Sequence, residues 1–168
     1  MTHYLELFVP LIISNVAHMF VVKFDGFACL KIPISVRAFG TNKTVRGFVF
    51  VGVLTGVLQV ILNRFLHGAF QFDSFVLGLS LGVTYMLCEL PNSFLKRRMG
   101  IQSGQKAAHR AWLFTLLDKS DSTLGVCLVF TLYKGLSASV FFQFFLVAFC
   151  IHLTLSKVLQ LLRVKESL

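Results

Sequence analysis

Five long apolar stretches, separated by short polar segments, dominate the chain. A helix needs about 20 mainly apolar residues to cross the hydrocarbon core of a bilayer. Unpaired backbone groups are not tolerated there, so each stretch should form a helix. The predicted spans are residues 4–22, 48–66, 72–90, 122–136 and 138–162. The fourth is short, and a full crossing would require it to begin earlier or to be shielded by its neighbours. The pattern predicts an all-α, polytopic membrane protein with about five transmembrane helices.

Basic residues fall unevenly between the polar segments. Most lie at residues 23–47 and 91–121 and near the C-terminus, whereas only Arg64 and Lys134 lie in the other two connections. Because lysine and arginine accumulate in cytoplasmic loops, we expect the N-terminus outside and the C-terminus in the cytoplasm. The N-terminus lacks a basic region and a small-residue cleavage site, so the first stretch is predicted to be a retained span. These features predict an integral protein of the cytoplasmic membrane.

Composition supports the membrane class. Mean hydropathy is +0.79, and only 14% of the 168 residues are charged, compared with about a quarter in ordinary soluble domains. This length suggests a single domain over residues 1–168, with the connections 23–47 and 91–121 carrying any site. Topology and anionic lipid headgroups explain the net charge of +9. We expect no nucleic-acid partner, because the basic residues lie in short loops held at the membrane.

Small residues and cysteines indicate packing. The scattered cysteines, which form no C-x-x-C pair, are Cys29, Cys88, Cys127 and Cys150. We interpret them as small apolar residues. The pairs Gly52-x-x-x-Gly56 and Gly78-x-x-x-Gly82 have a spacing that lets helix backbones approach closely. We expect them to pack spans within the chain, and they do not by themselves indicate an oligomer.

The first polar cluster precedes the second span and reads Phe39-Gly40-Thr41-Asn42-Lys43-Thr44-Val45-Arg46-Gly47. Its glycines free the backbone, while Asn42 and Thr44 add hydrogen-bonding groups beside the cations Lys43 and Arg46. Cations next to the amides of a helix start suit a phosphate group. The alternative is a basic membrane anchor combined with a helix cap.

The second cluster ends the third span and reads Glu89-Leu90-Pro91-Asn92-Ser93-Phe94-Leu95-Lys96-Arg97-Arg98. An ionisable group near the hydrocarbon, such as Glu89, is costly unless it is paired or functional. Pro91 is expected to kink or end the helix. The polar and basic residues that follow within one or two turns are Ser93, Lys96 and Arg97. A stop-transfer signal would explain the cations but not Glu89.

The third cluster reads Leu117-Asp118-Lys119-Ser120-Asp121-Ser122-Thr123 and leads into the fourth predicted span. Asp118 and Asp121 are three residues apart, so they would share one face of a helix. Paired carboxylates suit Mg²⁺, which usually keeps waters and substrate phosphates as its other ligands. The alternative is that the acids cap the helix and complement its dipole.

Together the clusters combine cations for phosphates, carboxylates for a metal and access to lipid. Phosphoryl and nucleotidyl transfer need mainly charge neutralisation and in-line positioning. No Ser-His-Asp pattern, Walker A loop or H-E-x-x-H zinc site is present. His18 and His152 lie in apolar spans and are interpreted as packing or helix-contact residues.

At these residues the chain resembles the CDP-archaeol synthase family, itself related to phosphatidate cytidylyltransferases. The matching segments lie between residues 39 and 125 and are Phe39-Gly40-x-Asn42-Lys43-Thr44-x-Arg46-Gly47-Phe48, Glu89-Leu90-x-x-Ser93-Phe94-x-Lys96-Arg97-Arg98-x-Gly100-Ile101 and Leu117-Asp118-x-x-Asp121-x-x-x-Gly125. Five spans also fit that family.

The resemblance implies transfer of CMP from CTP to a membrane lipid phosphate, with release of pyrophosphate. It also implies Mg²⁺, held by Asp118 and Asp121 with a further contact from Glu89. The substrate-binding residues, which would contact CTP or the lipid phosphate, would be Asn42, Lys43, Thr44, Arg46, Glu89, Ser93, Lys96 and Arg97. The catalytic group would comprise Lys43, Lys96, Asp118 and Asp121. This site should open to the bilayer on the cytoplasmic side.

The chain also departs from the family pattern. Residues 31–37 are basic and apolar where the archaeal enzymes usually have an acidic, glycine-rich stretch, and Cys88-Glu89-Leu90 replaces Gly-Asp-Leu. Lys119 and Ser120 stand where the relatives commonly have Gln-Leu. Metal chemistry could survive these changes, whereas the lipid acceptor stays open. Two other functions are kept as alternatives: a CTP-dependent polyprenol kinase and a non-catalytic membrane transport or assembly subunit.

Overall fold

The computed structural model describes residues 2–68, 70–102 and 111–161, without the side chains of residues 111–115, 118, 119, 159 and 160. The helices in this part of the chain are α1 (Thr2–Lys23), the short 3-10 helix η1 (Ala28–Leu30), α2 (Val36–Phe39), α3 (Val45–His67), α4 (Phe72–Arg98), α5 (Ala111–Lys134) and α6 (Ala138–Leu161). A single β-bridge joins Pro33 to Thr44. The all-α prediction is confirmed.

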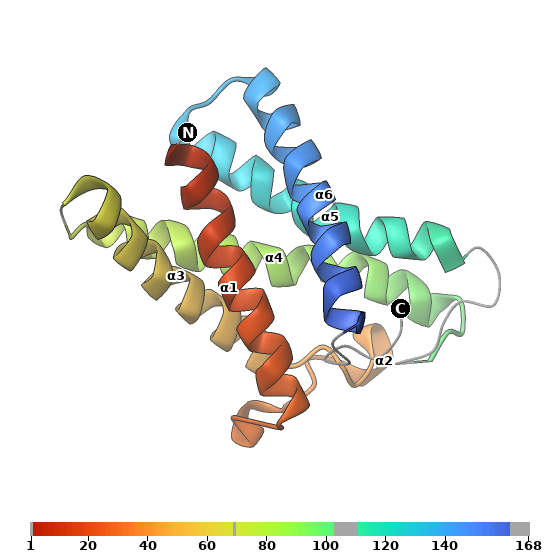
Figure 1. Ribbon diagram of the computed structural model, residues 1–168. Coiled ribbons are helices and arrows are strands. Elements are labelled where there is room, and N and C mark those ends of the chain that lie inside the picture. The colour runs from red at the N-terminus through yellow and green to blue at the C-terminus, as the bar shows by residue number, and fades with distance from the viewer. Residues whose placement is uncertain (1, 69, 103–110, 162–168) are drawn as a thin grey trace.

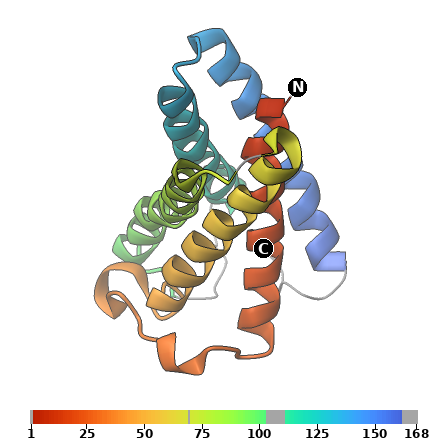
Figure 2. The ribbon, with the colours of Figure 1, turned by 90° about the vertical axis from the view of Figure 1, so that its left-hand side faces the viewer.

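Long helices form the body of the protein, and the connection between α1 and α3 folds beneath one end of it (Figures 1 and 2). The most extensive contact is between α3 and α4. In addition, α1 packs on α3, α5 packs on α4, and α6 packs on α5. The short helix α2 contacts α4. We call this side of the molecule, where α1 and α4 end and α3 begins, the loop end of the bundle.

Helices α3 and α4 approach each other most closely at four glycines. A Cβ atom at Gly78 would lie 2.8 Å from the Cα atom of Gly56, and one at Gly82 would lie 2.8 Å from the Cα atom of Gly52. Such distances leave no room for a side chain. The expectation that the two Gly-x-x-x-Gly pairs pack spans within the chain is therefore confirmed.

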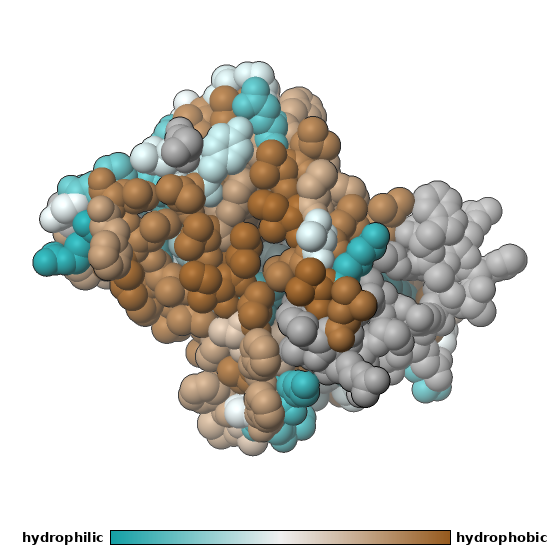
Figure 3. Space-filling view, in the orientation of Figure 1, coloured by the Kyte–Doolittle hydropathy of each residue, from teal (hydrophilic) through white to brown (hydrophobic). Residues whose placement is uncertain are grey.

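Among the described residues, four helices are long and apolar enough to cross a membrane: α1, α3, α4 and residues Ala138–Val158 of α6. Apolar residues cover the middle of the face in Figure 3, and hydrophilic residues gather at its margins. Phe65 and Phe142 are 84% and 66% exposed, as expected for side chains that face lipid. These features indicate a polytopic membrane protein. A fifth crossing by α5 and the orientation of the termini stay predictions.

The third span does not end at Pro91, because α4 continues to Arg98. Pro91 removes one backbone donor, but the next two residues, Asn92 and Ser93, are buried, and the Ser93 hydroxyl donates to the carbonyl oxygen of Glu89 at 3.0 Å. Packing of these residues sustains the helix past the proline. The predicted connection at residues 91–121 is correspondingly shorter, since residues 91–98 and 111–121 belong to helices.

The fourth long helix also differs from the prediction, because α5 begins at Ala111 and not near residue 122. Asp118 and Asp121 thus lie within the helix. The alternative that they cap its N-terminus is wrong. The sequence Ala-Trp-Leu-Phe-Thr-Leu-Leu at residues 111–117 is apolar, and the charged residues after it only interrupt the apolar pattern and do not break the helix.

Candidate active site

The connection between α1 and α3 has a defined backbone that places residues 41–44 at the start of α3. The Ser35 hydroxyl accepts a hydrogen bond from the Ala38 amide at 3.3 Å and begins α2. Gly40 ends it with φ 85°, a conformation that favours glycine. Around the bridge at Thr44, the Ile34 amide donates to the Lys43 carbonyl oxygen at 3.0 Å. This pairing fixes the predicted phosphate-binding segment against the bundle.

A cavity of about 210 Å³ lies at the loop end, between α1, α3, α4 and the connection. Its polar lining residues are His18, Lys31, Thr41, Asn42, Lys43, Thr44, Arg46 and Glu89. Five of these residues are predicted site residues. Glu89 lies in α4, and the other four lie at the start of α3 and are Asn42, Lys43, Thr44 and Arg46. The fold therefore joins the first and second polar clusters at one cavity.

Lys43 and Glu89 form an ion pair across this cavity, in which the Lys43 ammonium group donates to Oε2 of Glu89. The two side chains are only 21% and 19% exposed. A carboxylate near the hydrocarbon is costly unless it is paired, so Lys43 accounts for the presence of Glu89 at the end of an apolar stretch. The same ammonium group is available to a phosphate that competes with the carboxylate.

Arg46 is held by the turn that follows α1. Its side chain is 4% exposed, and Nη1 donates to Oδ1 of Asp25 at 3.0 Å and to the carbonyl oxygen of Gly26 at 2.9 Å. Nζ of Lys31 lies 2.9 Å from the same Oδ1 atom. Hydrogen bonds from Lys31 and Arg46 hold the pKa of Asp25 below its usual range.

The remaining residues of the second cluster lie along the last turns of α4, beyond the cavity wall. The rings of Phe39 and Phe94 are 6.5 Å apart, so α2 packs against this part of α4. Arg97 donates through Nη1 to the carbonyl oxygen of Ile101. Ser93, Lys96 and Arg97 follow the cavity residue Glu89 in α4, but they do not line the cavity themselves. Lys96 and Arg97 are partly exposed on these turns, whereas Ser93 is buried.

The carboxylate of Asp121 approaches the site from α5. Four residues later, at Gly125, α5 crosses α4 so closely that a Cβ atom would overlap the sulfur of Cys88, the residue before Glu89. The side chain of Asp118 lies outside the described residues. Among the side chains that are described, no three His, Cys, Asp or Glu residues gather as a metal site. Glu89 lines the larger cavity and Asp121 does not, so the metal set Asp118, Asp121 and Glu89 stays a prediction.

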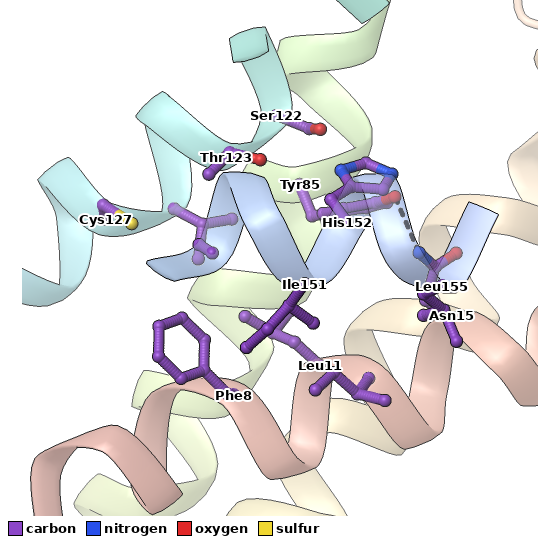
Figure 4. Close-up of a pocket in the computed structure, with 13 residues that line it drawn as sticks. Phe8, Leu11, Asn15, Tyr85, Ser122, Thr123, Cys127, Ile151, His152 and Leu155 are labelled. Carbon is purple, nitrogen blue, oxygen red and sulfur yellow. Dashed lines mark hydrogen bonds between the residues drawn. The ribbon is translucent and has the colours of Figure 1, made fainter. Parts of the chain in front are cut away.

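A second, smaller cavity of about 60 Å³ lies between α1, α4, α5 and α6 (Figure 4). Its wall is mostly apolar, but Nδ2 of Asn15 donates to the Tyr85 hydroxyl at 2.7 Å. His152 lies beside Tyr85 with ring centroids 6.1 Å apart, which agrees with its interpretation as a helix-contact residue. The hydroxyls of Ser122 and Thr123 reach the same cavity from α5.

Lys31 and His18 line the larger cavity, and Asp25 binds two of its cations, but none of these three is among the predicted site residues. Lys31 was attributed to topology, His18 to packing, and Asp25 received no role. Gly47 leaves space for the His18 imidazole, since a Cβ atom at Gly47 would lie 3.4 Å from Nε2. The available signal for Asp25 was its rarity, as one of seven acidic residues in the chain, directly before Gly26 in a basic connection.

The sequence of this chain matches a family of known proteins. A model of the CarS-like family, described as CDP-archaeol synthase, matches residues 6–168. The chain belongs to this family. The match includes all three polar clusters and both cavities, so the resemblance seen in the sequence is confirmed. The family match also covers the turn that carries Asp25.

Individual relatives have moderate identity. The CDP-archaeol synthase of Methanoculleus marisnigri is 34% identical over 102 residues, which cover 58% of this chain and 57% of the relative. Those of Sulfurisphaera tokodaii and Pyrobaculum aerophilum are 28% and 31% identical over 131 residues, covering 77% of this chain and 72% and 73% of the relatives. No solved structure matches significantly.

Proposed function

We propose that this protein transfers CMP from CTP to a membrane lipid phosphate, forming a CDP-lipid and pyrophosphate. The observation that carries the proposal is the cavity at the loop end, where Lys43 and Arg46 meet Glu89 at the boundary of apolar helices. Membership of the CDP-archaeol synthase family supports the same reaction. The relatives are CDP-archaeol synthases, which suggests an archaeol-type lipid phosphate as the acceptor.

The chemistry requires mainly charge neutralisation. Lys43 and Arg46 would bind the triphosphate of CTP, and Asn42 and Thr44 would donate hydrogen bonds beside them. An oxygen of the lipid phosphate then attacks the α-phosphorus in line, and the bond from that phosphorus to the bridging oxygen breaks. Pyrophosphate leaves with the electron pair. The attacking phosphate is already ionised at neutral pH, so neither a general base nor a covalent enzyme intermediate is needed.

The ion pair between Lys43 and Glu89 would be exchanged when the nucleotide binds. A phosphate oxygen competes with Oε2 of Glu89 for the Lys43 ammonium group, and a triphosphate carries more negative charge than one carboxylate. Glu89 would then accept a hydrogen bond from the nucleotide or contact a metal ion. The pair thus keeps both side chains neutralised in the free protein and places them at the cavity.

Asp118 and Asp121 would hold Mg²⁺. Carboxylate oxygens are suitable ligands for this hard cation, which is commonly bound through one or two carboxylates plus substrate phosphates. The crossing of α5 over α4 at Gly125, one turn after Asp121, supports this assignment, because it lies against Cys88, the residue before Glu89. Bound Mg²⁺ would neutralise charge on the triphosphate.

The lipid acceptor would approach from the bilayer along α4. Ser93, Lys96 and Arg97 extend from the cavity along the last turns of this helix and would orient the lipid phosphate or the nucleotide. Five crossings, with the C-terminus in the cytoplasm, would place the loop end on the cytoplasmic side, where CTP is available.

The test is incubation of the purified protein with CTP labelled at the α-phosphate, Mg²⁺ and a panel of lipid phosphates. We expect label in a CDP-lipid and stoichiometric release of pyrophosphate. Release of CDP with phosphate transfer to a polyprenol would indicate the kinase. An absence of turnover with every acceptor, in protein that remains folded, would favour a non-catalytic subunit.

A further inference from the structure

We propose that Asp25 is a positioning residue, which holds one side of the Arg46 guanidinium group and leaves the Nε side available for a phosphate of the nucleotide. The inference rests on the proposed function, since it identifies how the same cavity prepares its buried cation. Asp25 lies outside the three polar clusters of the sequence, 21 residues before Arg46.

The contacts of Arg46 are confined to one side of its guanidinium group. Nη1 donates to Oδ1 of Asp25 at 3.0 Å and to the Gly26 carbonyl oxygen at 2.9 Å. Nε is buried and has no hydrogen-bond partner among the described residues. A buried donor without an acceptor is costly. Because Arg46 lines the cavity, an oxygen of a bound phosphate would relieve this cost by accepting from Nε.

The turn that carries Asp25 is conformationally strained. Asp25 and Phe27 have φ values of 49° and 52°, in the left-handed region that non-glycine residues rarely adopt. The Gly26 amide donates to the Val21 carbonyl oxygen at 2.8 Å, and the Phe27 ring lies 5.7 Å from that of Phe50 on α3. Strain of this kind persists only where surrounding contacts impose it, and it concentrates at functional sites.

Lys31 gives Asp25 a second role at the same wall of the cavity. Its Nζ atom lies 2.9 Å from Oδ1 of Asp25, the atom that also accepts from Arg46. One carboxylate oxygen therefore fixes the positions of two cations. Without its negative charge, the buried guanidinium group would lose its counterion and would reorient toward water.

The test compares Asp25→Asn with the wild-type protein in the CTP assay. The amide keeps the size of the side chain but removes its charge. We expect the KM for CTP and the inhibition constant of pyrophosphate each to rise about 10-fold, as expected for weakening one charge-assisted hydrogen bond. The KM for the lipid phosphate should change little, and the loss of thermal stability should be small because the Asp25 side chain is 52% exposed. Asp73→Asn, which removes the same charge at the start of α4, should leave all four quantities unchanged.

A double-mutant cycle separates positioning from a structural role. Arg46→Lys keeps the positive charge but has no Nε side. In that background we expect Asp25→Asn to change the KM for CTP by less than about 2-fold. Equal effects in both backgrounds, an unchanged or lower KM in Asp25→Asn, or a parallel change of both KM values with loss of thermal stability would overturn the inference.

Two further measurements keep the test independent of folding and of turnover. If Asp25→Asn does not fold, Asp25→Glu keeps the charge and moves the carboxylate, and its KM for CTP should rise about 3-fold. If the protein shows no turnover, the dissociation constant of pyrophosphate is measured at equilibrium for the same wild-type, single and double variants. A wild-type protein that makes no CDP-lipid contradicts the proposed function, whereas active protein with uncoupled Asp25 and Arg46 contradicts only the inference.

Discussion

The two ends of the helix bundle each contain a carboxylate bound by several basic groups, but only one of them borders a cavity. At the loop end, Asp25 binds Arg46 and Lys31 beside a space of about 210 Å³. At the opposite end, Glu6 is 3% exposed, and its basic partners His3, His67 and Lys134 line neither of the cavities described above. A cluster of charged residues therefore does not by itself distinguish a binding site from a set of ion pairs that only connects helices.

Both carboxylate oxygens of Glu6 are bound by basic groups. Oε1 lies 3.1 Å from Nε2 of His67, and Oε2 lies 2.8 Å from Nζ of Lys134 and 3.3 Å from Nδ1 of His3. These partners connect the start of α1 to the ends of α3 and α5. At the loop end, by contrast, Arg46 keeps a buried donor without a partner among the described residues. The difference between the two ends is unused donor capacity next to open space.

The largest expected effect concerns the acids of α5. Asp121→Asn or Asp118→Asn should reduce kcat by about 1,000-fold, because each removes a charge that would bind Mg²⁺ on the triphosphate. Turnover of labelled CTP by detergent-purified protein measures this. Ser120→Ala, a substitution between the two acids, is the control and should retain activity. Wild-type rates in Asp121→Asn would remove the metal assignment.

A smaller loss is expected at the ion pair that crosses the cavity. Lys43→Met should reduce kcat/KM for CTP by about 100-fold, since it removes the largely buried ammonium group that would contact a phosphate of CTP. Glu89→Gln should have the weaker effect, because Lys43 keeps its charge. Steady-state kinetics with varied CTP make the comparison, and Arg64→Met, which removes an exposed cation farther along α3, should be neutral. Equal losses for Lys43→Met and Arg64→Met would mean that only net charge matters.

At the opposite end, substitution should affect stability and leave the kinetics intact. Glu6→Gln leaves Lys134 without its counterion in a cluster whose carboxylate is buried and whose basic groups are partly exposed, and we expect a loss of roughly 1–2 kcal/mol in the free energy of unfolding. Thermal unfolding in detergent measures the loss, and the folded fraction should keep the wild-type KM for CTP. A changed KM with unchanged stability would contradict the distinction between the two ends.

The smallest effect is the pH dependence contributed by Asp25. The pKa of this carboxyl is lower in the folded protein than its ordinary value of 3.8, chiefly because of Lys31 and then Arg46. Its contribution to stability is therefore fully present above the ordinary pKa and is lost as the pH falls through the lowered, folded-state pKa. Thermal stability measured from about pH 6 to pH 3 should fall less steeply in Asp25→Asn than in the wild type. Identical slopes would show that the carboxyl is not linked to folding.

The apolar pattern anticipated most of the fold, because long hydrophobic stretches have few alternatives to a membrane helix. Residues 138–162 were predicted as a span, and α6 covers Ala138–Leu161. The pattern failed where polar residues lie inside a helix. Asp118 and Asp121 interrupted the apolar stretch of α5, and Pro91 suggested an end to α4, but both helices continue. Packing against neighbours decided these cases, and a pattern in one stretch does not record packing.

For the site, local composition predicted Asn42, Lys43, Thr44 and Arg46, since cations and small polar groups at a helix start suit phosphate, and all four line the larger cavity. The sequence also identified Glu89, because an acid at the end of an apolar stretch needs a reason. It did not identify the partner of either charged group. The sequence did not indicate Asp25, because the role of this residue depends on a turn that places it within hydrogen-bond distance of Arg46.

The sequence by itself determined the helical membrane class, the close packing of α3 on α4 through glycines, and the residue types suited to phosphate. These follow from hydrophobicity, side-chain size and charge, which each residue carries independently of its neighbours in space. Tertiary structure alone decided which carboxylate neutralises which cation, where space is left for a ligand, and that Glu6 ties helices while Glu89 lines a cavity and Asp25 binds two of its cations. Such properties depend on distances between residues far apart in the chain, and only the packed helices fix those distances.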